Sequence, residues 1–153
     1  MDSGEYPRRI YLDVCVLCRP FDDQNQMRVR LETDAVTLII SHVRRGDLWM
    51  PVSPVHQAEI AAISEKDERE YLQALLLQVG GTPSFDLERA RTRAEHLTGM
   101  GLGLADAAHL AFAEQSKADF VTCDLRLLAQ IRHIQTDIWC GSPIAYVEME
   151  ELS

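Results

Sequence analysis

The chain has 153 residues, of which 46% are apolar and 25% are charged. This is the size and composition of one ordinary globular domain that buries its core without disulfide bonds. Fifteen basic against 24 acidic residues give a formal charge of −9, which argues against a passive nucleic-acid coat protein. An enzyme that binds nucleic acid locally, through bound cations or a partner's basic groups, stays open.

Signals for export and membrane insertion are not found in the sequence. No early segment has the pattern of a signal peptide, and no apolar stretch has the length of a membrane span. The four cysteines are then expected to be reduced thiols. We therefore expect a cytoplasmic protein without membrane contacts.

The first half of the chain predicts strands alternating with helices. The apolar run from Ile10 to Asp13, with an extension to Val16, suits a buried strand. Helical spacing of apolar residues follows over about 24–45, and "DLWMPV" (47–52) suits a second strand. Ser53 and Pro54 then open a helix to about residue 63, and another helix is expected over 66–79, stopped by Gly80-Gly81.

The second half continues the alternation. "TPSFDL" (82–87) is expected to hold a brief strand, with a helix capped by Asp86 or Ser84 reaching about residue 97. The turn "TGMGLG" (98–103) leads into a helix over about 104–115. "ADFVTCD" (118–124) predicts a strand, "LRLLAQIR" (125–132) a helix, and "TDIWC" (136–140) a last strand before the acidic tail "VEMEELS".

This alternation predicts the fold class. Strands that alternate with helices are typical of an α/β fold with a mainly parallel sheet covered on both faces. The chain shows no repeat or linker, so one domain over residues 1–153 is expected, with a core of about 8–147 and a short acidic C-terminal tail.

Acidic residues end the two clearest strands. Asp13 ends "IYLD" and Asp124 ends "FVTCD". In an open parallel sheet, ligands bind outside the carboxyl ends of the strands. Either aspartate alone is more simply explained as a helix cap or turn residue. Finding one after each strand makes a shared acidic site more credible.

Two further acids lie on apolar faces of predicted helices. Glu59 stands between Val55 and Ile63 at a spacing of four residues, and Asp106 stands in the same way between Leu102 and Leu110. A carboxylate on a buried face needs a proton, a cationic partner or a metal ion. The simpler explanations are a boundary position for Glu59 and a helix-dipole preference for Asp106.

One hypothesis unites the four acids. Asp13, Glu59, Asp106 and Asp124 would meet at one sheet edge and hold Mg²⁺ or Mn²⁺, which prefer hard oxygen ligands. Such a site activates water for attack on a phosphodiester. The bound cation would then supply the local positive charge that the acidic surface lacks.

The other conspicuous residues favour structural explanations. Cys15 and Cys18 form a Cys-x-x-Cys pair, but Cys123 and Cys140 stand alone, so buried free thiols are favoured over a zinc site or a redox pair. "TGMGLG" lacks the spacing of a nucleotide-binding loop. His109, three residues after Asp106, could touch the site, although a structural role is favoured.

The order of "IYLDVCVL", "HQAEIAAI" and "LGLADAAHLAFAEQSKADFVTCDLRLL" resembles the PIN domain family, especially the single-domain toxins of VapBC toxin–antitoxin pairs. "LDVCVLCRPFDDQ" is similar to one PIN subgroup. The resemblance covers about residues 8–147. It implies a three-layer α/β/α fold and a Mg²⁺- or Mn²⁺-dependent endoribonuclease that cleaves RNA, forms a homodimer and is neutralised by a small antitoxin protein.

The resemblance also implies roles for single residues. It makes Asp13, Glu59, Asp106 and Asp124 the first to fourth catalytic and metal-binding acids, with Glu32 competing for the second place. Thr122 matches a hydroxyl near the last acid. Cys15 departs from the family, which often has Ser, Thr or Asn there, and a thiol is a poor hydrogen-bond donor. This departure puts full metal affinity and activity in doubt.

Two other function classes stay open. A haloacid-dehalogenase-like phosphatase also begins with a strand that ends in a nucleophilic aspartate, but it usually has a second aspartate where Cys15 stands. The other is a catalytically weak or inactive PIN-like module that binds a protein partner. The presence of all four acids argues against the second alternative.

Overall fold

The computed structural model describes residues 7–153 and contains one parallel sheet of five strands in the order β3-β2-β1-β4-β5. The first six residues of the expected domain lie outside the described part. The strands are β1 (Arg8–Leu12), β2 (Leu48–Pro51), β3 (Gly80–Gly81), β4 (Asp119–Val121) and β5 (Cys140–Gly141). Chain order reverses between β1 and β4, which pair with Ile10 beside Asp119 and Leu12 beside Val121.

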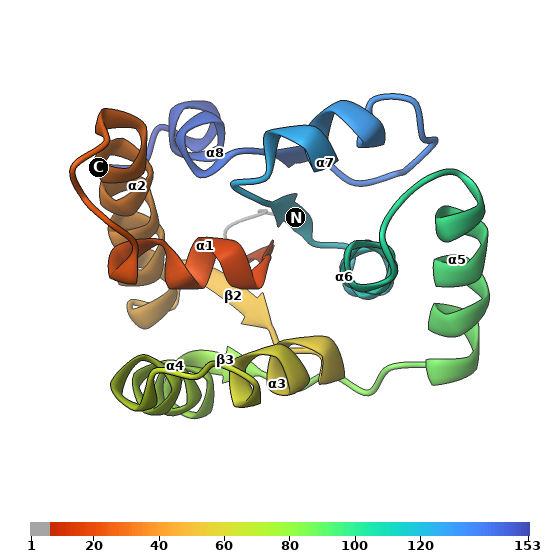
Figure 1. Ribbon diagram of the computed structural model, residues 1–153, viewed down its shortest axis with the longest axis horizontal. Helices are drawn as coiled ribbons and strands as arrows, with labels where there is room; N and C mark the ends of the chain where they lie inside the picture. Colours follow the sequence, from red (N-terminus) through yellow and green to blue (C-terminus); the bar gives the residue numbers. More distant parts are fainter. Residues whose placement is uncertain (1–6) are drawn as a thin grey trace.

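Helices cover both faces of this sheet (Figure 1). Those around the first core cluster are α1 (Val14–Cys18), α2 (Met27–Arg44), α4 (Lys66–Val79) and α8 (Pro143–Glu150). Those around the second cluster are α5 (Leu87–Gly99), α6 (Leu104–Ser116) and α7 (Leu125–Ile131). The helix α3 (Pro54–Ala61) contributes Ile60 to the first cluster, and a 3₁₀ turn (Arg19–Phe21) follows α1. The predicted three-layer α/β/α fold is confirmed.

Alternation along β1 explains the two layers. Ile10 and Leu12 are fully buried in the first cluster, while Tyr11 between them is fully buried in the second. Successive side chains of a strand point to opposite faces, so a strand buried on both sides reads as a continuous apolar run. The same pattern follows in β4, where Phe120 belongs to the second cluster and Val121 to the first.

Several predicted elements differ from the structure. The strand expected to extend to Val16 ends at Leu12, because the chain turns at Asp13, the residue before α1, into a helix. No strand lies within 82–87; the glycines before it, Gly80 and Gly81, form β3 instead. A Cβ atom at Gly81 would collide with the Trp49 ring, so the close pairing of β3 with β2 requires glycine there.

The end of the chain is the largest difference. Residues 143–150 form α8, although a solvated acidic tail was expected after residue 147. Ser142 accepts a hydrogen bond from the Ala145 N–H and caps the helix, and Tyr146 is fully buried against the first core cluster. The helix packs on α2, and of its two acids Glu148 is exposed while Glu150 is partly buried and pairs with Arg8. Within residues 7–153, no helix combines the length and apolar character that crossing a bilayer requires.

Candidate metal centre

The carboxyl ends of β1 and β4 place Asp13 at the point where the strand order reverses. Its backbone N–H donates to the Val121 carbonyl at 3.0 Å, which fixes Asp13 beside the end of β4. Its side chain is buried, and the Oδ2 atom accepts a hydrogen bond from the Thr122 hydroxyl at 2.8 Å. The Oδ1 atom faces His109, with Nε2 at 3.8 Å. One carboxylate oxygen is therefore held by the protein while the other faces the cluster.

Glu59 and His109 complete a compact group with Asp13. The Glu59 carboxylate and the His109 Nε2 are in hydrogen-bond contact, and one ligand atom from each of the three residues lies within 4.8 Å of the others. Within residues 7–153 this is the one group of His, Cys, Asp or Glu side chains that meets a metal-site spacing. No cysteine belongs to it, so the Cys-x-x-Cys pair does not contribute to this group.

Asp106 lies close enough to share the electrostatic field of this group. Burial raises the pKa of Asp106, and the negative charges of Asp13, Asp124 and Glu59 raise it further, while His109 lowers it. Asp106 is in the first turn of α6, one turn before His109, so both side chains lie on the same helix face. The other three acids predicted from the sequence are therefore near enough for their charges to act on Asp106.

Asp124 occupies the open side of the region. It is exposed, and its Oδ1 accepts a hydrogen bond from the Leu127 N–H at 3.0 Å, which caps α7. The simpler interpretation of this residue as a helix cap therefore describes one of its roles. Its charge also reaches Asp106, so capping and membership of the acidic region coexist.

Glu32, the competing second acid, has a different environment. Its carboxylate is 2% exposed and is paired with Arg19 at 2.7 Å and with Arg28 at 3.4 Å. Both cationic partners neutralise it, and Arg28 also donates to the Cys123 carbonyl. The structure brings Glu59, and not Glu32, together with Asp13.

Thr122 and Cys15 support the region from beneath. The Thr122 hydroxyl donates to Asp13, accepts from the Asp124 N–H at 3.1 Å and lies 3.4 Å from the Cys15 Sγ. A hydrogen bond with the Cys123 side chain and burial raise the pKa of the Cys15 thiol, so the thiol stays neutral. Cys15 thus contacts the residue that orients Asp13 and adds no charge.

His109 is the member of the group to which sequence reasoning gave a structural role. It is 1% exposed, and its Nδ1 lies 2.6 Å from the Tyr11 hydroxyl, which lies 2.7 Å from the Ser53 hydroxyl. The spacing of three residues from Asp106 was the available signal. No signal in the sequence indicated the contact with Tyr11, which lies 98 positions away in the chain.

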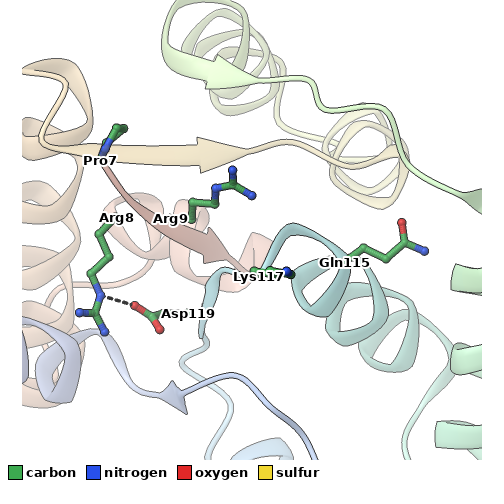
Figure 2. A pocket seen from close by; sticks show the side chains of 6 residues that line it. All are labelled: Pro7, Arg8, Arg9, Gln115, Lys117 and Asp119. Atoms are coloured by element: carbon green, nitrogen blue, oxygen red, sulfur yellow. Dashed lines mark hydrogen bonds and ion pairs between the residues drawn. The ribbon is translucent and has the colours of Figure 1, made fainter. Parts of the chain in front are cut away.

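A hollow of about 600 Å³ lies at the opposite, amino ends of β1 and β4 (Figure 2). Two of the side chains that line it, Arg8 and Arg9, already have partners. Arg8 donates to Asp119 at 2.8 Å, and Arg9 donates to the Ser116 carbonyl at 2.8 Å and lies 5.3 Å from the centre of the Trp49 ring. Figure 2 shows Arg8 and Arg9 on opposite sides of β1.

The chain matches the family model described as PIN domain over residues 10–134, which is most of its length. The protein belongs to the PIN domain family. The match spans the segments that carry Asp13, Glu59, Asp106 and Asp124. No curated protein sequence matches the chain.

Two solved structures are similar to this PIN domain. The crystal structure of FitAcB from Neisseria gonorrhoeae has 20% sequence identity and a TM-score of 0.50, covering 88% of this chain and 97% of that chain. The structure of FitAB bound to an IR36 DNA fragment has 20% identity and a TM-score of 0.52, covering 88% and 95%. At this identity the likeness supports the fold.

Proposed function

We propose that this protein is a Mg²⁺- or Mn²⁺-dependent endoribonuclease of the VapC type, the toxin of a toxin–antitoxin pair. The observation that carries the proposal is the compact group of Asp13, Glu59 and His109, where the strand order of a PIN-family sheet reverses, with Asp106 within reach of the charges of these acids. Four free thiols suit a cytoplasmic location. A homodimer and a small antitoxin partner belong to the proposal through the family resemblance.

The donor set fits a hard divalent cation. Two atoms that each lie about 2.1 Å from one ion are at most about 4.2 Å apart. One carboxylate oxygen of Asp13 and one of Glu59 lie within 4.8 Å of each other, which is close to that limit. Like charges gathered around Asp106 disfavour its ionised form, and a cation would relieve this repulsion. Carboxylate oxygens are the ligands that Mg²⁺ and Mn²⁺ prefer.

The residues of the proposed site have different roles, which follow from their positions. Asp13, Glu59, Asp106 and Asp124 would hold the ion, and Thr122 orients Asp13 through its hydroxyl. When bound, the ion would polarise the phosphodiester and make a water molecule more acidic, so that hydroxide forms at neutral pH. The exposure of Asp124 leaves the region open toward solvent, where a strand of nucleic acid is able to approach.

RNA cleavage by the purified protein tests the proposal. We expect cleavage of a generic RNA with Mn²⁺ or Mg²⁺, none with a chelator, and loss of cleavage in Asp106→Asn. Cys15→Ser should keep cleavage, because it gives a neutral neighbour of Thr122 that the family often has at this position and adds no ligand. Cleavage of DNA but not of RNA would overturn RNA as the substrate and leave a metal-dependent nuclease that acts on DNA.

One alternative function has the PIN fold but no nuclease activity. A PIN module that only binds a protein partner would show neither metal-dependent cleavage nor Mn²⁺ binding by calorimetry. That result would overturn the nuclease proposal.

A further inference from the structure

His109 lies among the acids in a way that a structural histidine does not require. Its Nε2 faces Asp13 Oδ1 at 3.8 Å and contacts the Glu59 carboxylate, while the ring is 1% exposed. It stands in α6 one turn after Asp106, on the same face. A ring nitrogen is therefore directed at the place where the carboxylates meet.

The second ring nitrogen is held by a short chain of hydroxyl groups. His109 Nδ1 lies 2.6 Å from the Tyr11 hydroxyl, and this hydroxyl lies 2.7 Å from Ser53 Oγ. Histidines that ligate metals nearly always place their other nitrogen against a hydrogen-bond partner, which fixes the ring and its tautomer. His109 already has such a partner, buried beneath the site.

The far end of this chain is fixed by His56. The Ser53 N–H donates to His56 Nδ1 at 3.0 Å, so His56 Nε2 carries the proton and donates to the Leu12 carbonyl at 2.6 Å. The tautomer of His56 is thereby set by the backbone.

The hydroxyl chain has two settings with the same number of protons. In one, Ser53 donates to Tyr11, Tyr11 donates to His109 Nδ1, and the Nε2–H donates to Glu59. In the other, His109 Nδ1–H donates to Tyr11, Tyr11 donates to Ser53, and the Ser53 hydroxyl shares the His56 Nδ1 lone pair, at 3.4 Å, with the Ser53 N–H. The second setting turns a lone pair of Nε2 toward the acids. The two settings differ by the rotation of two hydroxyl groups and by the position of the ring proton on His109.

We propose that His109 Nε2 is a ligand of the bound cation together with Asp13 and Glu59, and that Tyr11 and Ser53 hold the tautomer that permits it. This proposal rests on the metal-dependent function above. It adds a nitrogen donor to a site for which the sequence predicted oxygen donors alone.

A nitrogen donor changes which ion the site prefers. Mg²⁺ favours oxygen ligands in an octahedral shell, whereas imidazole favours first-row transition ions. We therefore expect Mn²⁺ to bind more tightly than Mg²⁺. Replacing His109 by Gln, which offers an oxygen, should lower Mn²⁺ affinity at least about tenfold and change Mg²⁺ affinity by less than about threefold.

Calorimetry with Mn²⁺ and Mg²⁺, and electron spin echo modulation of bound Mn²⁺, test the proposal without any substrate. The wild-type spectrum should contain the modulation of a directly bound imidazole nitrogen, and His109→Gln should lose it. Tyr11→Phe should keep it and lower Mn²⁺ affinity about tenfold, the effect of losing the partner of a ligating histidine. His133→Gln is the matched control, because the same substitution at an exposed histidine should change nothing.

The possible results separate this inference from the function on which it rests. Bound Mn²⁺ without imidazole modulation in the wild-type protein would overturn the nitrogen ligand and leave the nuclease standing. Modulation that persists in His109→Gln would assign the nitrogen to another histidine and overturn it as well. No Mn²⁺ binding at all would overturn both proposals.

Discussion

The two ends of the sheet differ in whether their charged side chains have partners of opposite charge. At the amino ends of β1 and β4, Arg8 is paired with Asp119 at 2.8 Å and with Glu150 at 2.6 Å, and Arg9 is bonded to a carbonyl and packed on Trp49. At the carboxyl ends, within residues 7–153, no Lys or Arg pairs with any of the four acids, and His109 is the one basic side chain in contact.

This difference separates stability from function. Charges that have partners stabilise a fold modestly and have little capacity to bind a ligand. Like charges without partners oppose folding, so their presence in a stable domain points to a ligand that compensates them. The four predictions that follow test the contrast, from the largest expected effect to the smallest.

Asp13→Asn should reduce metal-dependent RNA cleavage about 1000-fold, because several kcal/mol of transition-state stabilisation depend on the ion that Asp13 would hold. The amide oxygen still accepts from Thr122, so the fold should survive. Cleavage rates with circular dichroism as a folding control measure this. Undiminished cleavage by a folded variant would remove Asp13 from the site.

Thr122→Val should reduce cleavage about tenfold, the loss typical when a group that orients a metal ligand is removed. The variant keeps the side-chain shape but loses the hydroxyl between Asp13 and the Asp124 N–H. Thr37→Val, at an exposed helical threonine, is the matched control. Equal activity of the two variants would contradict an orienting role.

Asp106→Asn should stabilise the metal-free protein at neutral pH, with a modest rise in Tm. The folded-state pKa of Asp106 is raised by burial and by neighbouring acids, so the native state binds more protons than the unfolded state just above the ordinary value of 3.8. Stability then falls as pH rises through the raised pKa. The difference between variant and wild type should vanish below pH 3.8 in thermal melts over pH 3–8 with a chelator. A gap that persists at low pH would point to packing instead of charge.

Arg8→Ala should lower the free energy of unfolding by on the order of 0.5 kcal/mol, because half of the Arg8 side chain is exposed and solvent screens its pairs. RNA cleavage should not change, since Arg8 lies at the other end of the sheet. Urea unfolding and cleavage assays on the same preparation measure both. A loss of cleavage larger than twofold would contradict the inference that the amino ends of the strands serve stability and only the carboxyl ends serve function.

Local patterns predicted most of the fold. The helix expected over 66–79 has those bounds in the structure, since its start and its glycine stop are local signals. The strand β3 was missed because two glycines carry no apolar periodicity, and only their approach to Trp49 makes them a strand. The helix α8 was missed because its acidic residues suggested a solvated tail. Its buried face is defined by Tyr146, which packs against the first core cluster.

For the candidate site, the sequence predicted the four acids but not the contact between His109 and Tyr11. Position after a strand identified Asp13 and Asp124, and helical spacing identified Glu59 and Asp106 as acids on apolar faces. The contact between His109 and Tyr11 depends on which face of β1 meets α6, and this is decided by packing between segments 98 residues apart. No local pattern contains that information.

The pairing of β1 with β4 has a consequence for how the protein is made. Asp13 is held by the Val121 carbonyl and by Thr122, more than 100 positions later. A ribosome therefore synthesises most of the chain before these contacts are able to form. Nascent chains that have not yet exposed β4 should hold no assembled centre, so any activity of the centre would arise only after β4 has been synthesised.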